Sequence, residues 1–203
     1  MAAPEPFPGS NDVTPEEVAT AAADAEELLR SGEPLLAYDA IQQSLEKWPE
    51  DRRLRQLRGL ALARSGAVRR ANEELLALRE EGCEDGETLG LLARTHKDLA
   101  LASSPGPDRD QHLKAAFDIY SAGYRESVRR DAIADGYYTG INAATMALLV
   151  GNGESACELA TDVQEICKLA IREDCGRPGD TYWPQATLAE AALILGDRET
   201  AQE

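Results

Sequence analysis

The residues best suited to binding chemistry form a basic and polar set in a chain whose formal net charge is −16. Arginine and lysine donate charge-assisted hydrogen bonds to carboxylates, and arginine does so as a two-pronged donor. An amide can grip a ligand backbone, and an aromatic ring can stack on a ligand. The candidate partner-binding residues are Arg53, Gln56, Arg64, Arg94, Lys97, Tyr138, Asn142, Thr145 and Trp183. This set predicts a site for an acidic peptide or a chain terminus.

Several of these residues also have a structural interpretation. The four arginines between positions 52 and 58 could form a solvated face that pairs with nearby glutamates. We expect Asn142 in the first turn of its helix, where its amide would hold the preceding turn at Gly140. Aromatic residues at helix starts commonly pack on the previous hairpin. The aromatic residues at expected helix starts are Tyr137, Tyr138, Tyr182 and Trp183.

No combination of residues predicts catalysis. His96 stands where Leu28 and Leu62 stand in the preceding repeats, which predicts a core histidine without a nucleophile partner. Paired glutamates such as Glu73 and Glu74 are adjacent in sequence and so point to different parts of a helix surface. The four cysteines contain no C-x-x-C motif, and only two histidines accompany them. We therefore expect no enzymatic activity, no cofactor and no metal site.

A repeat of small residues defines the elements that must position the candidate residues. Two copies of the repeat small-x6-Gly-x4-Ala are 34 residues apart, which is the period of a tetratricopeptide repeat. Each such repeat is a helical hairpin, and stacked hairpins form a solenoid with a curved binding face. The sequence therefore predicts an all-α fold, an α-solenoid of about five tetratricopeptide-like hairpins with the last incomplete. The copies are Ala25/Gly32/Ala37, Gly59/Gly66/Ala71, Ala144/Gly151/Ala156 and Ala189/Gly196/Ala201.

The chain divides into a flexible segment over residues 1–13 and a tetratricopeptide-repeat domain over 14–203. We expect an expanded turn over 102–110 within the third hairpin, a partly helical linker over 124–134 before the fourth hairpin, and a loop over 175–180 before the fifth. The fifth hairpin stops one turn into its second helix, so we expect the chain to be part of a longer protein. The first helix of each hairpin should line the concave face and carry the candidate residues. The expected hairpins are about 14–49, 51–82, 86–124, 136–172 and 181–203.

Composition argues against several kinds of partner. A sequence pI near 4.5 disfavours nucleic acids and anionic membranes, because binding phosphate needs clustered and uncompensated cations. No apolar run reaches the ~18 residues of a membrane helix, and the first residues lack the basic and apolar parts of a secretory signal. Free thiols in a chain of this size indicate a reducing compartment. We therefore expect a cytoplasmic protein whose partner is another protein or an acidic peptide segment.

Part of the chain resembles a known family. The stretches 91–100 (LLARTHKDLA) and 138–151 (YTGINAATMALLVG), with Tyr182-Trp183 further on, are similar to the TRAFs-binding tetratricopeptide region of apoptosis signal-regulating kinases. In those kinases the region is a regulatory platform that binds adaptor proteins, and similar bacterial modules are joined to effector domains. The chain has no Gly-rich loop, H-R-D or D-F-G motif, so the resemblance implies control by protein contact without kinase activity.

These observations lead to one main hypothesis and two alternatives. The main hypothesis is a regulatory protein–protein interaction module, the sensor or adaptor part of a bacterial signalling or effector protein, which binds its partner on the concave face. Binding would change the stacking of hairpins three to five and so act on an attached or associated effector. The first alternative is the N-terminal regulatory region of a larger enzyme. The second is a peptide or small-molecule sensor that uses the hollow between hairpins four and five.

Overall fold

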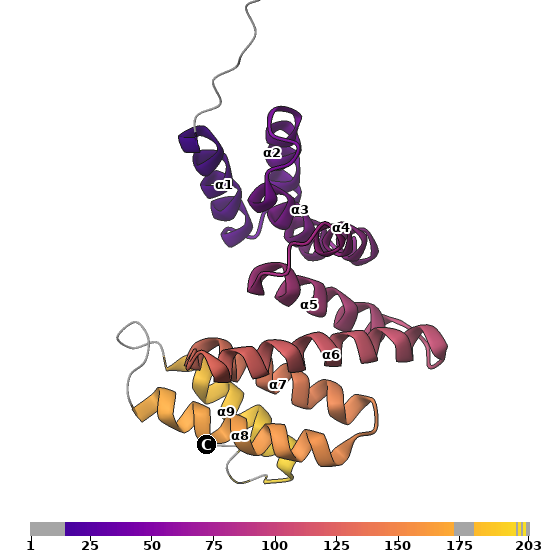
Figure 1. Ribbon diagram of the computed structural model, residues 1–203, viewed down its shortest axis with the longest axis vertical. Coiled ribbons are helices and arrows are strands. Elements are labelled where there is room, and N and C mark those ends of the chain that lie inside the picture. Colours follow the sequence, from indigo (N-terminus) through magenta and orange to yellow (C-terminus); the bar gives the residue numbers. More distant parts are fainter. Residues whose placement is uncertain (1–14, 173–180, 198, 200, 202–203) are drawn as a thin grey trace, which may run out of the picture.

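The computed structural model describes residues 15–172, 181–197, 199 and 201. All long regular elements among these residues are α-helices, and Ala201 has a 3-10 conformation. The long helices follow one another along the stack (Figure 1). They are α1 (Pro15–Arg30), α2 (Pro34–Lys47), α3 (Arg52–Arg64), α4 (Val68–Glu80), α5 (Gly86–Ala102), α6 (Pro107–Arg129), α7 (Ile133–Leu149), α8 (Gly153–Arg172) and α9 (Tyr182–Leu195).

Successive helices pair into hairpins, and the hairpins stack in chain order. Each helix packs on the next one along the chain, while α1 also contacts α3, α3 contacts α5, and α7 contacts α9. The first helices α1 and α3, α3 and α5, and α7 and α9 therefore lie side by side, as they do in a tetratricopeptide solenoid. The predicted all-α solenoid is confirmed.

Four turns explain why glycine recurs in the repeat. Gly32, Gly66, Gly151 and Gly196 all have a positive φ, at 80°, 88°, 84° and 78°. In each turn the N–H of the next residue donates to the carbonyl five positions earlier, as in Glu33 to Leu28 at 2.9 Å. This is the Schellman arrangement, in which a left-handed residue ends a helix and satisfies its last carbonyls. Glycine adopts that conformation without the strain that a Cβ would bring.

The small residues that precede these glycines lie where the two helices of a hairpin approach most closely. Ala25 and Ala144 are completely buried. At Gly59 a Cβ atom would lie 2.9 Å from the Cγ of Leu75, so α3 and α4 are in contact through the glycine itself. The close approach of the two helices, rather than the conformation of the turn, therefore explains why the first position of the repeat is a small residue.

The third and fourth hairpins differ from the sequence-based prediction. The expanded turn expected over 102–110 is wrong, because α6 already begins at Pro107 and only residues 103–106 connect it to α5. Proline fits the first turn of a helix, and Asp108 and Asp110 complement its dipole there. The segment 124–134 is mostly the end of α6, which runs to Arg129, and α7 starts at Ile133.

The early start of α7 moves Asn142. We expected this residue in the first turn of its helix, but it lies in the third turn, since α7 begins nine positions earlier. The misleading signal was Gly140, which suggested a turn but lies inside the helix. A Cβ at Gly140 would lie 2.5 Å from Val163 Cγ2 and 3.0 Å from the Tyr124 ring. Tertiary packing, not a turn, accounts for this glycine.

Three expectations fall on residues outside the described part of the chain. These are the flexible segment over 1–13, the loop over 175–180, and most of the second helix of the fifth hairpin. Among the helices that the structure describes, none combines the length and apolar character that crossing a bilayer requires.

Candidate partner-binding face

The candidate residues lie on the face formed by α1, α3, α5, α7 and α9, which we call the first-helix face. Their side chains do not lie side by side in one site. Most of them instead connect one first helix to the next, so that polar contacts run along the stack. The contacts fall into two groups, one around Arg53 on α3 and one around Lys97 on α5.

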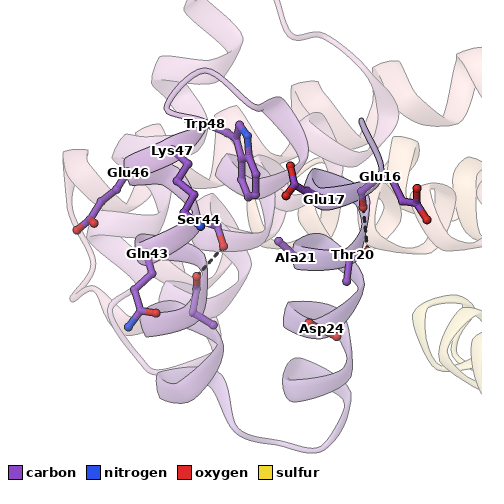
Figure 2. Close-up of a pocket in the computed structure, with 11 residues that line it drawn as sticks. Glu16, Glu17, Thr20, Ala21, Asp24, Gln43, Ser44, Glu46, Lys47 and Trp48 are labelled. Carbon is purple, nitrogen blue, oxygen red and sulfur yellow. Dashed lines mark hydrogen bonds between the residues drawn. The ribbon is translucent and has the colours of Figure 1, made fainter. Parts of the chain in front are cut away.

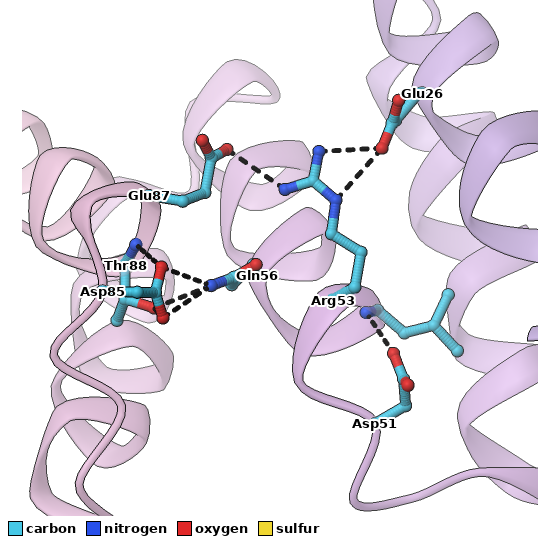
Figure 3. A network of polar contacts seen from close by, with 8 residues as sticks. Glu26, Asp51, Arg53, Gln56, Asp85, Glu87 and Thr88 are labelled. Carbon is cyan, nitrogen blue, oxygen red and sulfur yellow. Dashed lines mark hydrogen bonds and ion pairs between the residues drawn. The ribbon is translucent and has the colours of Figure 1, made fainter. Parts of the chain in front are cut away.

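Arg53 joins three helices through carboxylates (Figure 3). Its Nε and Nη2 donate to Glu26 Oε1 on α1 at 3.0 and 2.8 Å. Its Nη1 lies 3.3 Å from Glu87 Oε1 on α5. The positive charge of Arg53 is therefore compensated within the chain. Neighbouring arginines are also paired, Arg55 with Glu81 and Arg58 with Glu74, which favours the interpretation of this stretch as a paired face.

Gln56 and Arg64 are also engaged within the chain. Gln56 is only 4% exposed, and its Nε2 donates to Asp85 Oδ1 at 3.1 Å and to Thr88 Oγ1 at 2.8 Å. Asp85 in turn accepts from the Thr88 N–H and so caps the start of α5 (Figure 3). Arg64 donates from Nη1 to the Leu29 carbonyl at 2.7 Å, near the end of α1. Both side chains hold neighbouring hairpins together.

Lys97 differs from these residues because its partner is neutral. Its Nζ donates to Asn142 Oδ1 on α7 at 2.7 Å and lies 6.0 Å from the ring centre of Tyr120 on α6. Within the described residues no carboxylate lies within 4.0 Å of this ammonium group. Burial lowers the pKa of Lys97, the negative charges of Asp98 and Glu190 partly oppose this effect, and Arg94 adds a smaller lowering.

Two tyrosines and an arginine surround Lys97. Tyr120 is 1% exposed, and its buried hydroxyl makes no hydrogen bond of acceptable geometry with any described residue, although Tyr138 lies beside it. The two rings meet edge to face with their centres 6.3 Å apart, and Tyr138 is 46% exposed. Arg94 is exposed on the same helix as Lys97, and its Nε is 3.9 Å from Asp98 Oδ2, which is too long for a hydrogen bond. We call Arg94, Lys97, Tyr120, Tyr138 and Asn142 the Lys97 cluster.

The remaining candidate residues lie further along the stack. Thr145 on α7 donates to Glu190 Oε1 on α9 at 3.0 Å. Trp183 is 62% exposed and meets only the exposed Tyr182 edge to face, with the ring centres 5.1 Å apart. The interpretation of Tyr182 and Trp183 as packed against the previous hairpin is therefore wrong, because most of both side chains is exposed.

The structure also pairs two histidines, which sequence spacing did not reveal. Nδ1 of His96 on α5 lies 2.9 Å from Nδ1 of His112 on α6. His96 is half-buried rather than part of the core, and burial, with smaller effects of His112 and Arg79, lowers its pKa to about 4. No group of three or more potential metal ligands gathers within the described ranges.

A further feature missed from the sequence is a groove of about 750 Å³ between α1 and α2 (Figure 2). Its lining includes the carboxylates of Glu16, Glu17, Asp24 and Glu46, and Trp48 forms one wall. Its acidic residues lie on two different helices, so no local pattern in the sequence marks them as one surface.

Comparisons with known proteins place this geometry in a family. The family model called Tetratricopeptide Repeats-Sensor matches residues 37–147, more than half of the chain. Among solved structures, a thermophilic TPR protein in Thermus thermophilus is 15% identical, with a TM-score of 0.69 over 90% of this chain and 85% of that one. A second, MamA AMB-1, is 13% identical, with a TM-score of 0.56 over 93% and 87% of the two chains. The search of curated proteins finds no match.

The solved structures share the fold, and the family model covers helices from α2 to α7, including Lys97 and Asn142. Of the expected resemblance to the kinase-associated repeats, these comparisons support the tetratricopeptide repeat and the sensor family. The chain belongs to the Tetratricopeptide Repeats-Sensor family.

Proposed function

We propose that the chain is the sensing module of a regulatory protein and that it binds an acidic segment of a partner protein on the first-helix face, between α5 and α7. The family supports a sensor and protein-binding role. The position of the site and the acidic character of the partner are our inference from the distribution of charge along the face.

One contrast carries this proposal. The buried or half-buried arginines of α3 are each paired with a carboxylate of this chain. Lys97 is also half-buried, but its hydrogen-bond partner is the neutral amide of Asn142. A desolvated ammonium gains most from an anion, and Lys97 is the half-buried cation of this face whose hydrogen-bond partner among the described residues is neutral, with the exposed Arg94 beside it.

The same contacts supply a route from binding to regulation. The Lys97–Asn142 hydrogen bond joins the third hairpin to the fourth. A partner carboxylate that binds Lys97 competes with Asn142, so it changes the free energy of the contact between these hairpins. A ligand with different affinities for two stacking arrangements shifts their populations, and this shift is the signal to an attached or associated effector.

A peptide-display selection with the full chain tests the proposal. Random peptides that bind should be enriched in Asp and Glu, and their binding should weaken as salt rises because partly exposed charges are screened. The variant Arg94→Gln/Lys97→Met should lose this enrichment. Lys97→Met keeps much of the length and volume of the side chain, so the variant should fold.

A matched control removes two equivalent charges elsewhere. Lys114 and Arg129 are exposed on α6, where they pair with Asp118 and Glu126. The variant Arg129→Gln/Lys114→Met has the same change in net charge and should select the same acidic peptides as the unmodified chain. Acidic enrichment that persists in the Arg94/Lys97 variant, or disappears equally in both variants, would overturn the proposal.

A further inference from the structure

The Lys97 cluster contains two donors, one half-buried and one buried, whose hydrogen-bonding capacity the described residues do not fully satisfy. The ammonium group of Lys97 can donate three hydrogen bonds, and one is made, to Asn142. The hydroxyl of Tyr120 is buried without a hydrogen bond among the described residues. Buried polar groups in native proteins are nearly always hydrogen-bonded, so two such groups in one place require an explanation.

Both donors belong to the same small region. The Lys97 ammonium lies 6.0 Å from the centre of the Tyr120 ring. Tyr120 also meets Tyr138 edge to face with the ring centres 6.3 Å apart, and the Tyr138 carbonyl accepts from the same Asn142 amide whose oxygen binds Lys97. Two hydrogen bonds of about 2.8 Å made by the two oxygens of one carboxylate span roughly 7–8 Å. This upper limit exceeds the 6.0 Å between the ammonium group and the ring centre, so a single carboxylate is the right size of group to bridge the two donors.

From this geometry we infer that Lys97 and the Tyr120 hydroxyl form a seat for a single carboxylate of the acidic partner segment. Lys97 binds one oxygen, and Tyr120 donates to the other. Tyr138, which is half-exposed and packs edge to face on Tyr120, forms the entrance together with Arg94. The inference rests on the proposed function, because it identifies the contact that anchors the partner on the first-helix face.

A singly charged carboxylate fits this seat better than a phosphate. Asp98 and Glu190 lie close enough to influence Lys97 electrostatically. They would repel a group with about two negative charges more strongly than a group with one. A neutral carbonyl would accept the hydrogen bonds but would not compensate the desolvated ammonium.

Asn142 occupies part of the seat in the unbound chain. Its Oδ1 accepts from Lys97, while its Nδ2 donates to the Tyr138 carbonyl at 2.8 Å on its own helix. The amide is thus fixed by α7 and presents its oxygen to Lys97. A carboxylate that enters replaces or shares this oxygen, so removing the amide should strengthen binding rather than weaken it.

The test uses synthetic pools of short peptides with neutral residues around one central position, which is Glu, Gln or phosphoserine. Binding of each pool to the full chain is measured by fluorescence anisotropy. The Glu pool should bind at least tenfold more tightly than the Gln pool, because charge-assisted hydrogen bonds are worth about this factor or more. It should also bind more tightly than the phosphoserine pool.

Three variants separate a seat from a merely structural cluster. Lys97→Met should weaken binding of the Glu pool about ten- to hundredfold, and Tyr120→Phe should weaken it about fivefold without lowering the melting temperature. Asn142→Ala should tighten binding severalfold. A structural role for Tyr120 through Tyr138 predicts instead a lower melting temperature for Tyr120→Phe and unchanged binding.

The outcomes distinguish this inference from the proposed function. If acidic peptides still require Arg94 and Lys97 while Tyr120→Phe binds normally, the partner binds the face but the seat is wrong. Tighter binding of the phosphoserine pool, or weaker binding by Asn142→Ala, also overturns the seat. If the Arg94→Gln/Lys97→Met variant selects the same acidic peptides as the unmodified chain, both proposals fail.

Discussion

Gly140 offers the sharpest test of how the hairpins pack. A Cβ atom at this position would lie 2.5 Å from Val163 Cγ2 on α8 and 3.0 Å from the Tyr124 ring on α6. Contacts this short force a neighbour to move, and Val163 is β-branched, with few alternative rotamers. Gly140→Ala should therefore destabilise the fold even though alanine is the better helix former.

The magnitude follows from two opposing effects. Replacing glycine by alanine inside a helix gains about 1 kcal/mol in propensity. Overpacking a tight interior costs about 1–3 kcal/mol, and here the clash involves neighbours on two helices. The upper part of that range applies, so we expect a net loss of about 1–2 kcal/mol. For a chain of this size that is a fall in Tm of roughly 2–8 °C.

Gly90 provides the matched control on α5. No atom lies within 4 Å of a Cβ built there, and its φ is not positive. Gly90→Ala should therefore raise the free energy of unfolding by up to about 1 kcal/mol. Thermal unfolding followed by circular dichroism measures both variants. Equal shifts in Tm, or a higher Tm for Gly140→Ala, would refute the packing argument.

Two further predictions concern a turn and the histidine pair. Gly66 has φ 88° with open space around it. Gly66→Ala should therefore lower the free energy of unfolding by about 1–2 kcal/mol through backbone strain alone. Urea unfolding measures this loss, and an unchanged unfolding midpoint would contradict the role of the turn. Because the pKa of His96 is lowered from 6.5 to about 4, the neutral ring stabilises the fold above pH 6.5, and this contribution is lost as pH falls from 6.5 towards 4. His96→Gln should flatten the decrease in Tm over that interval, and an unchanged slope would show that other groups cause it.

The stack was predictable because its signals are local. A helix that ends in a left-handed glycine is marked within a few residues of sequence, and a small residue, Ala or Gly, lies seven positions before that glycine where the two helices meet. These two constraints recur in each regular hairpin, as at Gly32 and Gly66. Prediction failed where a glycine is required by close helix packing rather than by a turn. Gly140 suggested a turn, but it is the place where Tyr124 and Val163 approach α7.

The site was only partly predictable for a related reason. Position in the repeat identifies which residues face the first-helix side, but it does not say which of them are already paired. Arg53 meets Glu26 across 27 positions, and Lys97 meets Asn142 across 45. Such contacts depend on how hairpins stack. Tyr120 was missed because it lies on α6, the second helix of its hairpin, whereas the candidate residues were sought on the first helices.

The most direct test of the account is to map where an acidic peptide binds. Backbone amide chemical shifts of the isotope-labelled chain should be recorded as the Glu peptide pool is added. We expect the largest changes near Arg94 and Lys97 on α5 and between Tyr138 and Asn142 on α7, with little change around Arg53. Changes confined to the groove between α1 and α2, or to the exposed pair Tyr182 and Trp183, would contradict the claim that α5 and α7 form the binding site.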